Sequence, residues 1–296
     1  MDLNSVRRIA RRKPGYPPLL SELHDPPANL FVRGDGGPLS EPGVAVVGAR
    51  ACSAYGAQVA RTLARELASA GLVVVSGLAR GVDGEAHRGA LEGGGRTVAV
   101  LGCGIDRDYP RSHADLARRI VASGAVVSEY PPGVEPAPWR FPARNRIIAA
   151  LSLATVVVEA RERSGALITA DFALELGRDV FAVPGEITSG LSAGTNDLLR
   201  QGAAPLTAVR DVLEALGIEP EPAAGAASVS DAALALLSIL GDGACGADEL
   251  TRASGLASAE VSAALVELEL GGFAAQADGV YRSFSPGRSR AARRPA

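Results

Sequence analysis

Short β-branched runs that alternate with helical patterns constrain the fold of this chain more than any other feature. The runs lie at residues 44–47, 72–75, 98–101, 125–127, 155–159 and 179–183. Because they are largely apolar rather than alternating, they are typical of strands buried on both faces of a parallel sheet. Helical patterns lie between and after them, at residues 55–70, 113–123, 144–152, 166–176 and 209–216. The sequence therefore predicts an α/β fold with a doubly wound sheet.

A change in composition after residue 216 predicts a second, smaller domain. Residues 217–229 (GIEPEPAAGAASV) have the Pro, Gly and Ala content of a linker. Helical patterns follow at 231–240, 247–254 and 258–270, and a hairpin is expected to turn at Asp278-Gly279. This order is typical of a winged-helix domain. We divide the chain into a basic N-terminal segment (1–15), a sheet domain (16–216), a linker (217–229), a winged helix (230–284) and a basic tail (285–296).

Composition excludes several classes of protein. No apolar run approaches the ~18 residues of a membrane helix, and the basic start lacks the apolar stretch of a signal peptide. Cys52, Cys103 and Cys245 are odd in number and form no CxxC pair, so we expect neither a disulfide scaffold nor a zinc ribbon. These features predict a cytoplasmic protein with no metal and no membrane contact. The net charge is −3, but basic residues gather at both ends of the chain.

Glycine-containing turns follow successive predicted strands, at the sheet edge where parallel α/β folds bind ligands. Arg50 ends the first turn, and Arg80 lies in the second together with Gly77. The glycines serve either an approaching anion or merely tight turns, and the two arginines favour a phosphate site. The fingerprint GxGxxG lacks its third glycine after Gly102-Cys103-Gly104, and no GxxxxGK[ST] loop is present. We therefore expect no cofactor, neither NAD nor ATP.

The stretch WRFPARNRII combines aromatic side chains with arginines. Phe141 precedes a proline, so we expect it to be extended and to project from a loop, with a helix beginning after the proline. Arg144 and Asn145 would then lie in the first turn, where a cation opposes the helix dipole and needs another partner. Arginine beside a stacking aromatic ring is typical of a single-strand nucleic-acid site. The alternative is that Trp139 and Phe141 plug the sheet edge while the arginines are solvated.

Few residues suggest catalysis. Asp83 and His87 share one face of a predicted helix. They could orient a general base, but we favour a structural pair in which a capping Asp binds the His. Ser76, Ser128 and Ser164 follow strands without a GxSxG motif or an evident neighbouring His. We therefore predict no catalytic residue and no enzyme.

Five longer motifs occur in a fixed order: VAVVGAR (44–50), VVSGLARGVDGEAHRGAL (74–91), FPARNRIIAALS (141–152), EARERSGALITADFALELGRDVFAVPG (159–185) and SAGTNDLLRQGA (192–203). Their order and spacing resemble the DprA/Smf family, the DNA processing protein A family, from about Tyr16 to Leu216. The resemblance implies an extended Rossmann-like, mostly parallel fold that binds single-stranded DNA. It also implies a homodimer that protects DNA during natural transformation, displaces single-strand-binding protein and loads the RecA recombinase.

The resemblance also indicates site residues. The positions that match the family's DNA pocket are Arg50, Phe141, Arg144, Arg146 and the Ser164-Gly165 turn. Further candidates for single-stranded DNA binding lie in motifs at the same edge of the sheet: Gly77, Arg80, Asn145, Gly194 and Thr195.

Two features depart from the family pattern. Many relatives carry a helical, SAM-like domain before the position of Tyr16; here that domain is missing, or the true start lies upstream. The predicted recognition helix carries Glu260, Glu267 and Glu269 and no basic residue, so we expect the winged helix to bind protein or to regulate.

Two alternative functions are kept open. One is a duplex-DNA-binding regulator that acts through the winged helix. The other is a LOG-type nucleotide-monophosphate phosphoribohydrolase, whose PGGxGTxxE loop is matched best by Ser164–Thr169. That segment lacks both the glycine run and the Glu.

Overall fold

The computed structural model describes residues 6–218, 230–241, 243–271, 273–277 and 279–283, and it divides the chain into two compact units, residues 1–220 and 221–296. Residues 219–229 of the predicted linker and the predicted tail lie outside the described residues. The finer segment boundaries stay predictions. Among the described residues there is no helix with the length and apolar character needed to cross a membrane.

Within the described residues, nine strands form the sheet of the first unit: β1 (Arg7–Ala10), β2 (Asn29–Gly34), β3 (Gly43–Val47), β4 (Val73–Ser76), β5 (Thr97–Leu101), β6 (Ala125–Ser128), β7 (Ala154–Val157), β8 (Asp179–Ala182) and β9 (Ala204–Pro205). Their order across the sheet is β1-β2-β6-β5-β4-β3-β7-β8-β9. β2 pairs antiparallel with β1 and β6, and the other neighbouring strands run parallel. The predicted mostly parallel, doubly wound sheet is confirmed.

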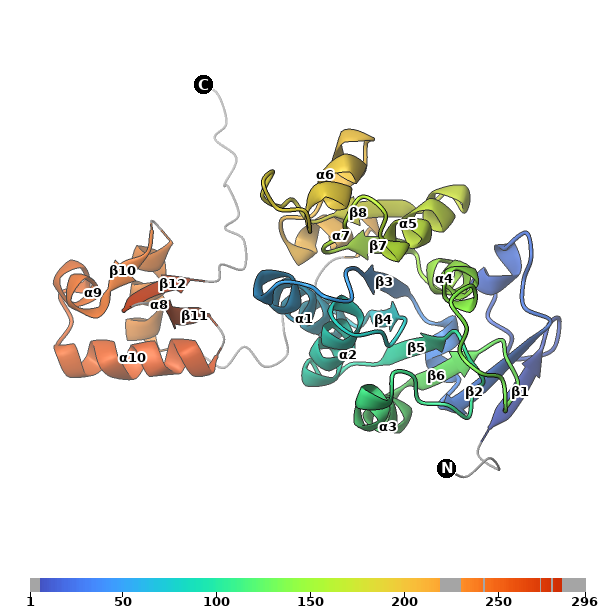
Figure 1. Ribbon diagram of the computed structural model, residues 1–296. Helices are drawn as coiled ribbons and strands as arrows, with labels where there is room; N and C mark the ends of the chain where they lie inside the picture. The colour runs from blue at the N-terminus through green and yellow to red at the C-terminus, as the bar shows by residue number, and fades with distance from the viewer. Residues whose placement is uncertain (1–5, 219–229, 242, 272, 278, 284–296) are drawn as a thin grey trace, which may run out of the picture. The chain divides into compact units, whose positions relative to one another are not determined.

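Helices cover both faces of this sheet: α1 (Ala54–Ser69), α2 (Val82–Glu92), α3 (Ala114–Ser123), α4 (Arg140–Ala150), α5 (Gly165–Glu175), α6 (Ala193–Arg200) and α7 (Val209–Ala215). α4, α5 and α6 pack on one face, and α1, α2, α3 and α7 pack on the other (Figure 1). Successive strand residues point to opposite faces, so Ala45 enters one core while Val44 and Val46 enter the other. Burial on both faces explains why these strands are apolar throughout.

The strand order reverses at β3. From β3 the chain continues through β4, β5 and β6 on one side, and it then returns to β7, β8 and β9 on the other. In such sheets the loops after the two central strands diverge and leave a crevice at the carboxyl edge. The loop after β3 carries Arg50, and the loop after β7 carries Ser164. The fold therefore places two of the predicted motifs at one crevice.

Several elements were not predicted from the sequence: β1, β2, β9 and α6. β1 consists of Arg7–Ala10, which we had assigned to a separate basic segment, and it pairs with β2 at the edge of the sheet. An edge strand needs only one paired side and tolerates charged side chains, so it carries little of the apolar signal of a central strand. α6 was missed because it is short and contains Gly194, a poor helix former, near its start.

The second unit contains α8 (Asp231–Leu240), β10 (Cys245–Gly246), α9 (Ala247–Ser254), α10 (Ser258–Leu270), β11 (Ala274–Ala277) and β12 (Val280–Ser283). The strands form a small sheet in the order β10-β12-β11. The predicted helices and hairpin are confirmed, although Asp278 of the expected turn lies outside the described residues. Val261, Leu265 and Leu268 of α10 enter the core. The carboxylate of Glu267 accepts hydrogen bonds from the backbone N–H and hydroxyl of Ser230, at 2.8 and 2.7 Å.

Candidate functional site

A cleft of about 440 Å³ lies where the loops after β3 and β7 meet the start of α4. Its position is the strand-order reversal, where doubly wound sheets bind their ligands. The predicted site residues that line it are Arg50, Phe141, Arg144, Asn145, Ser164 and Gly165. The structure therefore brings together about half of the candidates that the sequence indicated.

An exposed arginine and two aromatic rings stand at the opening of the cleft. The guanidinium carbon of Arg50 lies 5.2 Å from the ring centre of Phe141. The Phe141 ring stacks on Tyr109 with 5.4 Å between centres and 26° between planes. Phe141 also lies so close to Gly102 that a Cβ there would meet its Cδ1 at 2.8 Å. The glycine thus makes room for the ring, and a cation is held beside an aromatic pair.

Phe141 does not lie in a loop as predicted, because α4 begins at Arg140. The proline that follows Phe141 occupies the first turn of the helix, where a missing backbone N–H removes no hydrogen bond and the ring is tolerated. The expectation that Arg144 and Asn145 lie in the first helical turn was therefore wrong. They lie further along α4, and both are buried.

The loop that carries Arg50 is held by Glu159, which follows β7. The backbone N–H of Ala49 donates to the Glu159 carbonyl at 2.7 Å. The Glu159 carboxylate accepts the backbone N–H of Ser53 at 2.9 Å and its hydroxyl at 2.5 Å. This carboxylate sits at the N-terminus of α1, where dinucleotide-binding folds hold a pyrophosphate. The protein fills that anion position with its own side chain.

Arg144 lies beneath the cleft and is 4% exposed. Its guanidinium donates to the carbonyl of Gly77 at 2.8 Å and to that of Val100, and its Nε donates to Asn145 Oδ1 at 3.1 Å. Burial lowers the pKa of Arg144 to about 10, opposed mainly by the nearby carboxylate of Asp83. Gly77 is required at this place because a Cβ would overlap the guanidinium. Arg144 thus binds the residue that follows β4 and a residue near the end of β5.

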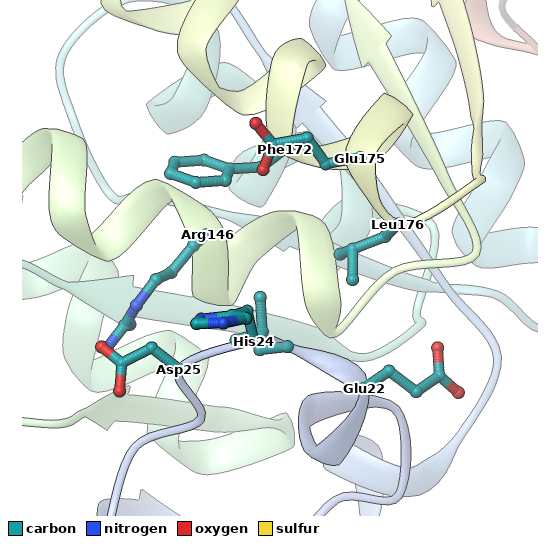
Figure 2. Close-up of a pocket in the computed structure, with 8 residues that line it drawn as sticks. Glu22, His24, Asp25, Arg146, Phe172, Glu175 and Leu176 are labelled. Carbon is teal, nitrogen blue, oxygen red and sulfur yellow. The ribbon is translucent and has the colours of Figure 1, made fainter.

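Arg146 lies at a different cavity, of about 650 Å³ (Figure 2). Its guanidinium pairs with Glu129 at 2.7 Å and with Asp25 at 3.8 Å. The cavity is also lined by Glu22 and Glu175. Two positions apart on one helix, Arg144 and Arg146 point in different directions. The structure therefore does not bring Arg146 to the cleft, and its surroundings are acidic.

The first turn of α5 forms the wall opposite Arg50. The hydroxyl of Ser164 accepts the backbone N–H of Ala166 at 3.3 Å and caps the helix. The side-chain amide of Asn145 donates to the Gly165 carbonyl at 2.9 Å, which ties α5 to α4. Gly165 is exposed, and no atom lies within 4 Å of the position of a Cβ. A ligand can therefore approach the backbone here closely.

The remaining candidates do not line the cleft. Arg80 is exposed in the turn between β4 and α2. Gly194 and Thr195 are buried in α6. The backbone N–H of Gly194 donates to the Ala160 carbonyl at 2.8 Å, and the Thr195 hydroxyl donates to the Ser192 carbonyl at 3.1 Å. Gly194 thus holds α6 against the loop after β7, whereas the Thr195 hydroxyl binds a carbonyl at the start of its own helix.

Asp83 and His87 are both buried, but they do not bind each other as we expected. The Asp83 carboxylate accepts the backbone N–H groups of Gly77 and Ala79, at 3.1 and 3.4 Å. His87 Nδ1 lies 2.7 Å from the hydroxyl of Thr97. Desolvation lowers the pKa of His87 to about 3, so the ring is neutral at physiological pH. Asp83 therefore stabilises the loop after β4 at the floor of the site, whereas His87 contacts the first residue of β5 and does not line the cleft.

Sequence reasoning missed Tyr109 and Glu159. Tyr109 lies in the loop after β5, whose sequence has no periodic pattern. Only the fold brings its ring to Phe141. Glu159 begins the fourth motif, so its position was visible, but its partner Ser53 lies 106 residues away in sequence. Among the described residues, no group of three or more His, Cys, Asp or Glu side chains could hold a metal ion.

The fold and the cleft define a class: Rossmann-like α/β proteins with an arginine and aromatic site at the strand-order reversal, joined to a winged helix. Residues 7–217 match the family model of the DNA recombination-mediator protein A, and residues 219–279 match that of the DprA winged helix domain. The chain belongs to this DprA/Smf family of DNA processing proteins.

Individual relatives support this membership. A relative from Mycobacterium tuberculosis is 47% identical over 84% of this chain, and the match covers 66% of that relative's own length, just under two thirds. The solved structure of DNA processing protein A from Streptococcus pneumoniae is 47% identical with a TM-score of 0.68, and covers 70% of this chain and 73% of that chain. The Helicobacter pylori protein, solved in a study of its single-stranded DNA binding mode, is 33% identical with a TM-score of 0.65, over 71% of this chain and 95% of that chain.

We expect Arg144→Met to lower the free energy of unfolding by about 3–5 kcal/mol, because it leaves the buried Asp83 without its counter-charge and two carbonyls without donors. Chemical denaturation measures this loss. Arg50→Ala is the matched control, and its exposed side chain predicts a change within about 0.5 kcal/mol. Equal losses for the two variants would show that Arg144 does not hold the floor of the cleft.

The depressed pKa of His87 predicts an acid dependence of stability. The unfolded chain binds a proton at this side chain below a pH of about 6.5, whereas the folded protein does so only near 3. The free energy of unfolding should therefore fall between these values as the pH is lowered, by up to about 1.4 kcal/mol per pH unit from this group. His87→Asn should reduce that slope, and His24→Asn, at an exposed site, should leave it unchanged. Equal slopes for the wild type and His87→Asn would contradict the assignment.

Proposed function

We propose that this chain binds single-stranded DNA in the cleft between α4, α5 and the Arg50 loop. The observation that carries the proposal is the exposed guanidinium of Arg50 beside the stacked rings of Phe141 and Tyr109. Arginine binds phosphate with a planar set of donors, while aromatic rings stack bases of any sequence. The single-stranded DNA binding named for the Helicobacter pylori relative supports the same ligand.

The finer role follows from family membership. We infer that the protein acts as a cytoplasmic homodimer that protects single-stranded DNA in transformation and recombination. Its inferred partners are RecA, which it would load onto the strand, and single-strand-binding protein, which it would displace. The inferred role is binding rather than catalysis, because the described residues that line the cleft include no His or Cys, and the hydroxyl of their one Ser, Ser164, caps α5.

The DNA-binding site in the cleft is tested with fluorescent oligonucleotides, single-stranded and duplex, at several salt concentrations. We expect the single strand to bind more tightly. Arg50→Ala should weaken binding similarly for all base compositions and reduce the slope of log K against log[salt] by about 0.7, the value for one phosphate contact on a single strand. Arg65→Ala, on the distal half of α1, is the control. If Arg50→Ala and Arg65→Ala bind alike, the DNA site lies elsewhere.

We expect loss of the Phe141 ring to reduce single-strand affinity by about 1–3 kcal/mol, because one stacked base loses its platform. Phe141→Leu is a better test of stacking than Phe141→Ala, because leucine still fills the space above Gly102. The melting temperature should stay close to that of the wild type. Wild-type affinity for Phe141→Leu would assign the ring to packing alone.

A further inference from the structure

Trp139 is an exposed aromatic side chain next to the cleft. It is the single Trp of the sequence, it is 63% exposed, and it immediately precedes α4. The alternative in which Trp139 packs into the edge of the sheet is wrong for this residue, because such a side chain would be buried. Pro138 and Phe141, on either side of it in sequence, both line the cleft. Trp139 therefore lies next to the cleft in sequence and faces solvent.

The indole is held on one side by a cation. The guanidinium carbon of Arg140 lies 4.5 Å from the Trp139 ring centre and 5.3 Å from that of Tyr130. Arg140 thus lies against both rings, and its Nη1 donates to the Glu135 carbonyl. With Arg140 against the indole and 63% of the residue exposed, a broad part of its surface is open to a ligand.

The loop that leads to Trp139 is itself anchored. The backbone N–H of Gly104 donates to the Val134 carbonyl at 2.8 Å, and that of Ile105 donates to the Tyr130 carbonyl at 3.3 Å. Glu135 pairs with Arg107 at 2.6 Å. These bonds fix the segment on the loop after β5. An immobilised ring loses little conformational entropy when a ligand stacks on it.

We propose that Trp139 is a second stacking platform for a nucleobase, which continues the path of a single strand beyond Phe141. The proposal rests on the proposed function. The chemistry that favours a nucleobase is a flat, electron-rich ring surface that is open to solvent on the side away from Arg140. A second copy of this chain would be the other occupant of an exposed indole, and the experiment below distinguishes the two.

The single Trp supplies the measurement, because the tryptophan emission of the wild type reports on residue 139 alone. Oligothymidylate should change this emission on binding. An abasic oligonucleotide of the same length, which offers phosphates but no bases, should bind more weakly and leave the emission unchanged. Trp139→Ala should bind oligothymidylate from about 5-fold to about 150-fold more weakly than the wild type. Trp139→Phe should recover most of that loss. The wild type and Trp139→Ala should bind the abasic strand alike.

The outcomes separate the two proposals. Failure of the wild type to bind any single strand would refute the proposed function itself. If the wild type binds and Arg50→Ala weakens binding, but Trp139→Ala binds as the wild type does and the emission is unchanged, the second platform is refuted while the cleft stands. A change of oligomeric state in Trp139→Ala, measured by light scattering, with unaltered DNA affinity would assign the indole to contact with a second copy.

Discussion

The geometry of the cleft depends on one buried cation. Arg144 donates to the carbonyls of Gly77 and Val100, at the ends of β4 and β5, and so fastens α4 to the carboxyl edge of the sheet. A guanidinium is expensive to remove from water unless its donors are satisfied and an opposite charge is near. Asp83 supplies that charge, and burial raises the pKa of its carboxyl group. Because α4 is fixed in this way, Phe141 one helical turn earlier is held over Gly102 and beside Arg50.

Three arginines that look equivalent in the sequence differ in what surrounds them. Arg50 is exposed, and its guanidinium lies beside the ring of Phe141. Arg144 is buried against carbonyls, and Arg146 is paired with Glu129. A cation that already has close partners gains little from a phosphate, whereas an exposed cation gives up only water. We therefore propose that Arg50 contacts phosphate and that Arg144 supports the site.

The central sheet could be predicted because double-sided burial leaves an unmistakable apolar pattern, as in β3 and β4. The position of the candidate cleft could be predicted because parallel α/β sheets bind ligands at the loops that follow such strands. The role of Arg144 could not be predicted, because its partners are backbone carbonyls of Gly77 and Val100, which any sequence would offer. The helical state of Phe141 was missed because the restriction before proline was applied without the tolerance for proline in a first turn. Tyr109 was missed because tertiary contact alone brings its ring to the site.

The carboxylate of Glu159 limits where a ligand phosphate can bind in this Rossmann-like fold. Its carboxylate takes the N-terminus of α1, so a phosphate cannot bind there as in a dinucleotide site. In the proposed function, phosphate is instead recognised by Arg50, whose side chain is exposed. A mononucleotide enclosed at a helix terminus has no room for a continuing chain, but a phosphate held at an open rim leaves both neighbouring linkages in solvent. The Glu159 carboxylate therefore makes the N-terminus of α1 a structural position, and the open cleft beside it is consistent with the polymeric ligand that we propose.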